Sequence, residues 1–180
     1  MSRAFVGLGA NLGPARSTVR WALRELEGLG AVRASSLYRT EPLCDPPDPE
    51  QPWFVNAVAE LTTDWPAPAL LRALLELEAK AGRPARRRRW SPRVLDLDLL
   101  IYDDRVLRTS TLTLPHPDLV RRRFVLEPLA EIAPDLSVPR DGRTVRQLLA
   151  ELDDPLRVER IPDGLPRRSP PASPAGEYVP

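Results

Sequence analysis

The segment that reads Leu-Asp-Leu-Asp-Leu-Leu-Ile constrains the fold more than any other part of the chain. Side chains two residues apart on a β-strand lie on the same face of the sheet. Asp96 and Asp98 should therefore lie side by side, with Leu95, Leu97 and Leu99 on the opposite face. Two adjacent carboxylates repel each other unless a cation lies between them. The segment thus predicts a strand, which its apolar content places at the centre of a sheet, with one core face and one acidic site.

An arginine-rich segment directly precedes this acidic pair, between Arg83 and Arg93. Magnesium prefers oxygen ligands and is typically held by one or two carboxylates together with substrate phosphates. Arginine side chains match phosphate groups because they present several planar donors. The two features together favour a magnesium site for nucleotide phosphates. Arg83 and Arg93 flank the segment and are placed to face inward, whereas Arg87 and Arg88 are most simply solvated.

Composition and charge restrict the class of protein. With 180 residues, 42% apolar and 28% charged, the chain is expected to form one soluble globular domain. No apolar run reaches the length of a membrane span and the first residues look like a strand, so we expect no signal peptide and a cytoplasmic location. One cysteine, Cys44, and one histidine argue against a disulfide and a structural zinc site. A net charge of +1 without a basic recognition helix argues against nucleic-acid binding.

The hydrophobic pattern predicts alternating strands and helices. Strands are expected at residues 2–8, 31–38, 54–63 and at the acidic pair, with helices at 14–29 and between Asp64 and Gly82. This order is the split βαβ pattern of an α+β, ferredoxin-like βαββαβ core. An additional hairpin is expected through Asp103-Asp104 into residues 105–107, and C-terminal helices near 124–132 and 145–152. The domain would span residues 1–160, followed by a Pro-rich, disordered tail at 161–180.

Three further positions combine residue types suited to binding. Phe54 and Asn56 fall on one strand face, where a ring and an amide could stack on a heterocycle and bond its edge. His116 lies between two prolines, which fix its backbone, and arginines follow it. Phe124 begins an apolar segment, and its structural alternative is core packing. For Asn56 the alternative is a satisfied buried amide, and for His116 it is a surface position.

Taken together, these motifs resemble one family, the 6-hydroxymethyl-7,8-dihydropterin pyrophosphokinases of folate biosynthesis. They occur in the family's order over about residues 3–150, and the Arg-Trp-x-Pro-Arg-x-Leu-Asp-Leu-Asp segment is highly specific. The matching stretches are Gly9-Ala10-Asn11-Leu12-Gly13, residues 36–43, residues 54–57, Leu77-Glu78, Gly82-Arg83, residues 89–98, Pro115-His116-Pro117, Arg122, Phe124-Val125-Leu126 and residues 128–134.

The resemblance implies transfer of the diphosphoryl group of ATP to the pterin hydroxymethyl oxygen, with release of AMP. It implies that Asp96 and Asp98 hold two Mg²⁺ ions and that Arg83 and Arg93 are catalytic. The pterin would contact Thr40, Pro42, Leu43, Phe54, Asn56 and Phe124. The co-substrate ATP would contact Glu78, Arg83, Arg86, Trp90, Arg93, Leu99, Thr113, His116 and Arg122. Segments 41–53 and 83–90 correspond to mobile loops of the family. The expected partners are the two small-molecule substrates alone, with no nucleic acid and no membrane, and the protein is expected to be a monomer.

Two other classes of function fit parts of the sequence. A magnesium-dependent phosphodiesterase or nuclease would use the same acidic pair and needs a third acidic ligand, for which Glu78, Asp103 and Asp104 are the candidates. A ferredoxin-like RNA-binding module would use the arginine segment and needs exposed aromatic residues on the sheet face. The sequence lacks those aromatic strand signatures.

Overall fold

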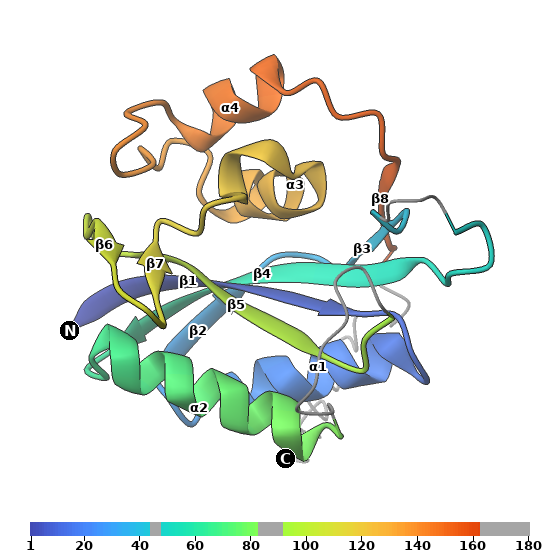
Figure 1. Ribbon diagram of the computed structural model, residues 1–180, viewed down its shortest axis with the longest axis horizontal. Coiled ribbons are helices and arrows are strands. Elements are labelled where there is room, and N and C mark those ends of the chain that lie inside the picture. Colours follow the sequence, from blue (N-terminus) through green and yellow to red (C-terminus); the bar gives the residue numbers. More distant parts are fainter. Residues whose placement is uncertain (44–47, 83–91, 163–180) are drawn as a thin grey trace, which may run out of the picture.

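Strands from distant parts of the chain form one antiparallel sheet in this computed structural model, which describes residues 1–43, 48–82 and 92–162. Within these ranges the sheet has six strands in the order β5-β1-β4-β3-β8, and β2 also pairs with β4 (Figure 1). The strands are β1 (Ser2–Ala10), β2 (Ala31–Ala34), β3 (Tyr38–Thr40), β4 (Phe54–Thr63), β5 (Asp96–Tyr102) and β8 (Val158–Arg160).

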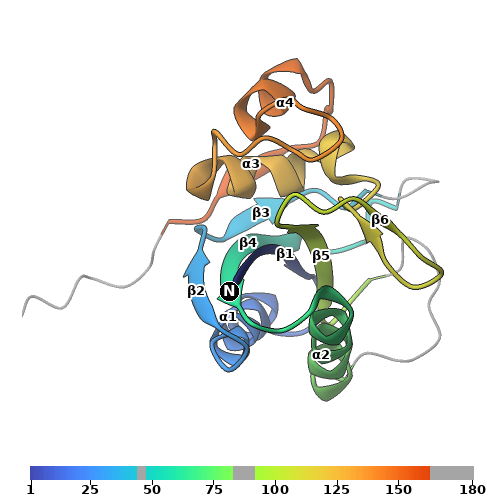
Figure 2. The ribbon, with the colours of Figure 1, turned by 90° about the vertical axis from the view of Figure 1, so that its left-hand side faces the viewer.

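Helices cover both faces of this sheet. Helices α1 (Ala15–Leu26) and α2 (Ala67–Lys80) lie on one face, and α3 (Arg123–Ile132) and α4 (Val145–Glu151) lie on the other (Figure 2). A short 3-10 helix (Leu119–Arg121) precedes α3. The order β1-α1-β2/β3-β4-α2-β5 confirms the ferredoxin-like α+β core predicted from the sequence.

Two hydrophobic clusters hold the layers together. The first lies between the sheet and α1 and α2, and it contains Leu95, Leu97 and Leu99 of the β5 region together with Leu70 and Leu74 of α2. The second lies between the opposite sheet face and α3 and α4. The predicted alternation is therefore confirmed, because Leu97 and Leu99 enter the first cluster while Asp96 and Asp98 line the pocket on the other face.

The prediction that the acidic strand is central is wrong, since β5 lies at the edge of the described sheet and pairs with β1. Its apolar content follows from the hydrophobic clusters on both faces of the sheet and not from strands on both sides. The backbone N–H of Leu97 donates to Oε1 of Glu78 at 2.8 Å, and Glu78 is only 3% exposed. A helix side chain thus supplies an acceptor at a sheet edge that would otherwise be open.

The single strand expected at residues 31–38 is divided in two. Ala34 pairs with Ala59 and Tyr38 pairs with Asn56. The chain therefore advances four residues from β2 to β3 while β4 advances only three. One extra residue is the definition of a β-bulge. Ser35 bridges the interruption, because its N–H donates to the carbonyl of Val58 and its Oγ accepts from the N–H of Val58.

The hairpin predicted at Asp103-Asp104 forms later in the chain, between residues 107 and 114. Asp103 and Asp104 do turn, but the N–H of Asp103 donates to Arg3 O and the chain then leaves β5. The hairpin consists of β6 (Leu107–Arg108) and β7 (Thr113–Leu114), which form a separate two-stranded sheet. It closes where the N–H of Thr109 donates to the carbonyl of Leu112.

The described chain ends beside β3. Strand β8 pairs with β3, and the N–H of Ile161 donates to the carbonyl of Leu37 at 2.8 Å. Most of the predicted tail, residues 163–180, lies outside the described residues. Among the residues that are described, no helix has the length and apolar character needed to cross a membrane.

Candidate active site

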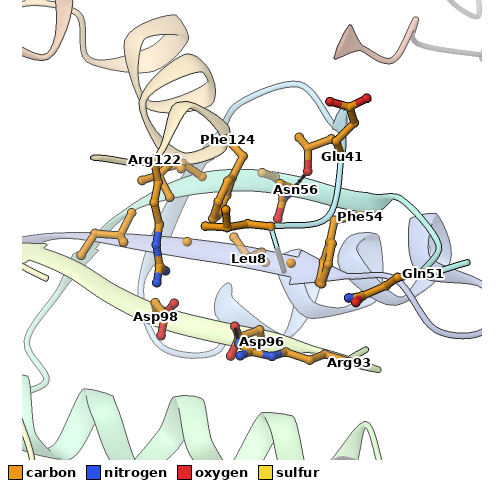
Figure 3. A pocket seen from close by; sticks show the side chains of 18 residues that line it. Leu8, Glu41, Gln51, Phe54, Asn56, Arg93, Asp96, Asp98, Arg122 and Phe124 are labelled. Atoms are coloured by element: carbon orange, nitrogen blue, oxygen red, sulfur yellow. Dashed lines mark hydrogen bonds and ion pairs between the residues drawn. The ribbon is translucent and has the colours of Figure 1, made fainter. Parts of the chain in front are cut away.

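A pocket opens on the α3 face of the sheet, between the ends of β1, β4 and β5 and the start of α3 (Figure 3). The pocket is open to solvent, and the space within it, open mouth included, is about 770 Å³. Its lining includes Gly7, Leu8, Gly9, Thr40, Glu41, Leu43, Gln51, Phe54, Asn56, Arg93, Asp96, Asp98, Leu100, Arg122 and Phe124.

The acidic side of the pocket carries both carboxylates of β5. Asp96 forms an ion pair with Nη1 of Arg93, three residues earlier. Arg122 extends from the start of α3 toward Asp98 (Figure 3), and its Nη2 donates to Asp118 at 2.5 Å. Cationic side chains thus lie beside both acidic residues, an arrangement suited to a polyanionic ligand that bridges a metal and arginines.

His116 adds a directed donor to this side. Its backbone N–H donates to Leu100 O at 2.8 Å, which fixes its position beside β5. The N–H of Asp118 donates to Nδ1 of the imidazole at 3.2 Å. In the neutral ring the proton therefore resides on Nε2, and this nitrogen lies 4.0 Å from Oδ1 of Asp98.

The electrostatic environment disfavours a charged Asp98 in the absence of a metal. Burial raises the pKa of its carboxyl group, and the negative charge of Asp96 raises this pKa further. His116, Arg122 and Arg93 offset part of this effect. The side chain is still 38% exposed, toward the pocket. A carboxylate that is costly to ionise alone becomes favourable when a cation shares its site.

The donor set fits magnesium. Both side chains offer only oxygen ligands, which magnesium prefers. Within the described ranges, no cluster of three or more His, Cys, Asp and Glu side chains is grouped as for a metal. The protein would therefore supply two carboxylates, and the remaining positions suit phosphate oxygens and water, as is common for magnesium bound with nucleotides.

The other side of the pocket is aromatic and amide-lined. Figure 3 shows Phe54 of β4 and Phe124 of α3 on two sides of the pocket, with Asn56 between and behind them. The Nδ2 atom of Asn56 donates to Oγ1 of Thr40 at 2.6 Å, which orients the amide. A flat heterocycle could therefore stack between the rings with its edge toward the amide.

Gly9 makes this amide position possible. Gly9 pairs with Asn56 across β1 and β4. A Cβ atom at residue 9 would lie 2.7 Å from Oδ1 of Asn56, closer than such atoms approach in proteins. The glycine is therefore required by the close approach of the Asn56 side chain over the strand, and not only by the turn that precedes α1.

Asn11 connects the two segments that border the pocket. Its Oδ1 accepts from the N–H of Arg93 at 2.7 Å, and its Nδ2 donates to the carbonyl of Pro52 at 2.9 Å. Its own N–H donates to the carbonyl of Arg93. The side chain is 4% exposed. One buried amide thus fixes the end of the 41–53 segment against the start of the acidic strand.

The structure brings together most of the residues predicted for the site. In the lining are Thr40, Leu43, Phe54, Asn56, Arg93, Asp96, Asp98, Arg122 and Phe124, with His116 beside them. Four others do not line it: Pro42 adjoins lining residues, Glu78 contacts the edge of β5, Leu99 packs against α2, and Thr113 pairs with Arg108 in the hairpin. Arg83, Arg86 and Trp90 lie outside the described residues.

Sequence reasoning did not single out several residues of the site. Asn11 belongs to the matching stretch Gly9-Ala10-Asn11-Leu12-Gly13, but the sequence assigns it no role of its own. Its partners, Pro52 and Arg93, are distant in the sequence, so no local pattern indicates them. Gln51 is buried in the lining although it follows a segment rich in proline and acid, and its sequence context gave no signal.

A ferredoxin-like sheet that brings an acid pair, cationic side chains and an aromatic side into one pocket is the arrangement expected of one class, the nucleotide-dependent phosphoryl-group transferases. The family model described as 7,8-dihydro-6-hydroxymethylpterin-pyrophosphokinase (HPPK) matches residues 5–134. The chain belongs to this family, and with it to the ATP-dependent diphosphotransferases of folate biosynthesis.

Individual relatives agree with this assignment. The chain is 44% identical over 153 residues to a Synechocystis 2-amino-4-hydroxy-6-hydroxymethyldihydropteridine pyrophosphokinase, covering 83% of this chain and 76% of the relative. A Methylorubrum extorquens protein of the same name is 43% identical over 164 residues, covering 89% and 99%.

A solved structure agrees in fold. The wild-type Plasmodium falciparum HPPK-DHPS crystal structure superimposes with a TM-score of 0.62 at 15% identity, covering 83% of this chain. This chain spans 43% of that longer chain, and the likeness concerns the fold alone. The nuclease and RNA-binding alternatives receive no support from any of these comparisons.

Proposed function

We propose that the pocket transfers the β,γ-diphosphoryl group of ATP to the hydroxymethyl oxygen of 6-hydroxymethyl-7,8-dihydropterin and releases AMP. One observation carries this proposal: the acid pair on β5 and the aromatic pair of β4 and α3 line the same pocket. Groups suited to phosphates and groups suited to a heterocycle therefore lie in one pocket. Transfer between a nucleotide and a pterin requires that both substrates are held close together in this way.

The pterin would occupy the aromatic side. Phe54 and Phe124 would stack on its two faces, and the Asn56 amide, held by Thr40, would bond its edge. Leu43 also lines the pocket. Because a hydrogen-bonded edge rejects rings that lack the matching groups, Asn56 would supply most of the selectivity for a pterin.

The triphosphate would occupy the acidic side. Asp96 and Asp98 would hold two Mg²⁺ ions, which supply charge neutralisation between the triphosphate and the attacking hydroxyl. Arg93 and Arg122 would donate to phosphate oxygens, and the Nε2 proton of His116 points into the same region. The hydroxymethyl oxygen would bond to the β-phosphorus and lose its proton to water, while the bond from that phosphorus to the bridging oxygen breaks and this oxygen leaves with AMP.

A single chain in the cytoplasm would suffice for this reaction. The proposed partners are the two small molecules, ATP and the dihydropterin, without a second copy of the chain or a nucleic acid. The predicted Arg83, Arg86 and Trp90 would complete the nucleotide side from the segment beyond α2.

Product identification tests the proposal. The purified protein is incubated with MgCl₂, ATP and the dihydropterin, and the nucleotide products are separated. We expect AMP that appears only when the pterin is present, and no AMP from Asp98→Asn. Pterin-dependent ADP, or AMP that forms equally well without pterin, would overturn the proposal.

A further inference from the structure

The C-terminal segment at residues 152–161 contacts both sides of the pocket. Its first part lies against the start of α3, which carries Phe124. Its last part pairs with β3, which leads into the Thr40–Leu43 side. We refer to residues 152–161 as the strap. The proposed pterin site therefore has its two sides joined by a segment that does not itself line the pocket.

Arg157 makes the strongest contact between the strap and the pocket side. Its N–H donates to Oε2 of Glu41 at 3.0 Å, and its Nε donates to Oε1 at 2.8 Å. The N–H of Glu41 donates in return to the carbonyl of Arg157 at 3.1 Å. These bonds hold the pKa of Glu41 below its usual range. Glu41 is a lining residue, so this paired contact fixes the backbone at the mouth of the pocket.

The same guanidinium group also holds Trp53, at the far end of the 41–53 segment. The Arg157 guanidinium carbon lies 5.0 Å from the centroid of the Trp53 ring, and that of Arg39 lies 4.3 Å from it. Trp53 directly precedes Phe54, one of the two aromatic sides. Arg157 therefore contacts both described ends of the segment that borders the pocket.

The other end of the strap is attached beside the second aromatic side. The N–H of Arg123 donates to Oδ2 of Asp154 at 3.0 Å, and its guanidinium donates to the carbonyls of Asp154 and Leu152. Arg123 directly precedes Phe124. The positions of the two rings are thus linked through a chain of contacts that runs along the strap.

We propose that the strap sets the spacing between the two aromatic sides and that Arg157 is a positioning residue for the pterin. This inference rests on the proposed function, since it concerns the pterin side of that site. Arg157 does not line the pocket and would act through Glu41 and Trp53. Loss of its side chain should loosen the pterin side and leave the acid pair and its cations in place.

A purely structural role predicts something different. The Arg157 side chain is 67% exposed, and exposed ion pairs contribute little to stability. If Arg157 merely held the C-terminus, its removal would lower the melting temperature and affect both substrates equally. If it positions the pterin side, the Michaelis constant for the pterin should change alone.

The test is steady-state kinetics of Arg157→Ala, Arg157→Lys and the control Arg146→Ala. Arg146 is 66% exposed and pairs with Asp135 on the α4 side, far from the lining residues. We expect Arg157→Ala to raise the pterin KM about fivefold, because it loses an exposed ion pair and a cation–π contact together. Its kcat, its KM for ATP and its melting temperature should match the wild type, and Arg157→Lys should recover part of the loss. Arg146→Ala should leave every value unchanged.

An unchanged pterin KM in Arg157→Ala would overturn the inference, as would a parallel rise in both KM values. A second readout uses Glu41→Gln and the double variant. The effects of two residues that act through one contact are not additive, so the double variant should resemble Arg157→Ala, and full additivity would contradict the proposal. A wild-type protein that makes no AMP would instead refute the proposed function, so the two failures are distinguishable.

Discussion

The Oδ1 atom of Asn11 accepts a hydrogen bond of 2.7 Å from the N–H of Arg93, so a residue at the end of β1 fixes the residue that pairs with Asp96. The same side chain donates to the carbonyl of Pro52. The turn after β1 thereby places the phosphate-facing arginine and the end of the 41–53 segment relative to each other.

Replacement of this amide should affect both stability and catalysis. We expect Asn11→Ala to lower the free energy of unfolding by about 2 kcal/mol, because the buried amide makes two part-buried hydrogen bonds that are both lost. It should also reduce kcat by about tenfold, since the Arg93 N–H loses its acceptor and this residue is then held only through its carbonyl. Urea denaturation and steady-state assays measure the two effects. Thr18→Ala, which removes an exposed bond of 3.3 Å to Pro14, is the control and should change neither. Wild-type kcat in Asn11→Ala would refute the anchoring role.

A methyl group at residue 9 should damage the pterin side selectively. In Gly9→Ala the new Cβ would lie 2.7 Å from Oδ1 of Asn56, and this amide is held by Thr40. We expect pterin affinity, measured by fluorescence titration, to fall by about tenfold or more, as for the loss of one oriented hydrogen bond. Gly7→Ala is the matched comparison, because its Cβ would meet only the movable side chain of Leu100 at 3.4 Å. Equal effects of the two variants would show that the amide position does not matter.

Asp98→Asn should stabilise the metal-free protein while abolishing turnover. Burial and Asp96 raise the pKa of Asp98 above the ordinary value of 3.8. Between the ordinary value and the raised one, the folded state holds more protons than the unfolded state, so stability falls as pH rises through that window and stays reduced above it. The asparagine cannot ionise and avoids this loss.

Thermal unfolding in EDTA at pH 5 to 8 tests the direction. Asp98→Asn should melt above the wild type at neutral pH, and the difference should shrink as the pH falls. The exposed Asp104→Asn should follow the wild type throughout. A neutral-pH melting temperature of Asp98→Asn below the wild type would contradict the raised pKa. Magnesium-dependent activity should likewise decrease on acidification, because protons compete with the metal for this carboxylate.

Glu78 offers a test between a structural and a nucleotide-contacting role. It accepts from the N–H of Leu97 at the edge of β5. We expect Glu78→Ala to lose about 2 kcal/mol of stability, because a buried backbone donor loses a charged acceptor. Glu78→Gln keeps an acceptor and should lose less. If instead Glu78→Gln raised the KM for ATP at unchanged stability, the side chain would contact the nucleotide as the family resemblance implies.

The parts of the fold that depend on local periodicity could be predicted. The alternation at Asp96 and Asp98, the shared face of Phe54 and Asn56, and the strand–helix order all follow from spacings of two and of three to four residues. The edge position of β5 could not, because a strand covered by a helix is as apolar as one between two strands.

The remaining differences depend on contacts between distant residues. The bulge at Ser35 reflects bonds to Val58, and the role of Gly9 reflects the side chain that lies over it from β4. Asn11 bonds Pro52 and Arg93, which are 41 and 82 residues away. No pattern within one segment reports such partners, so only the assembled structure could assign these roles.

The most direct test of diphosphoryl transfer follows the β-phosphorus of ATP. The protein is incubated with Mg²⁺, the dihydropterin and ATP labelled at the β-phosphate, and the pterin and nucleotide products are separated. Our account predicts that the label moves to the pterin product while the nucleotide product is unlabelled AMP. Label retained in the nucleotide fraction as ADP, with a pterin product that carries none, would contradict transfer of the diphosphoryl group.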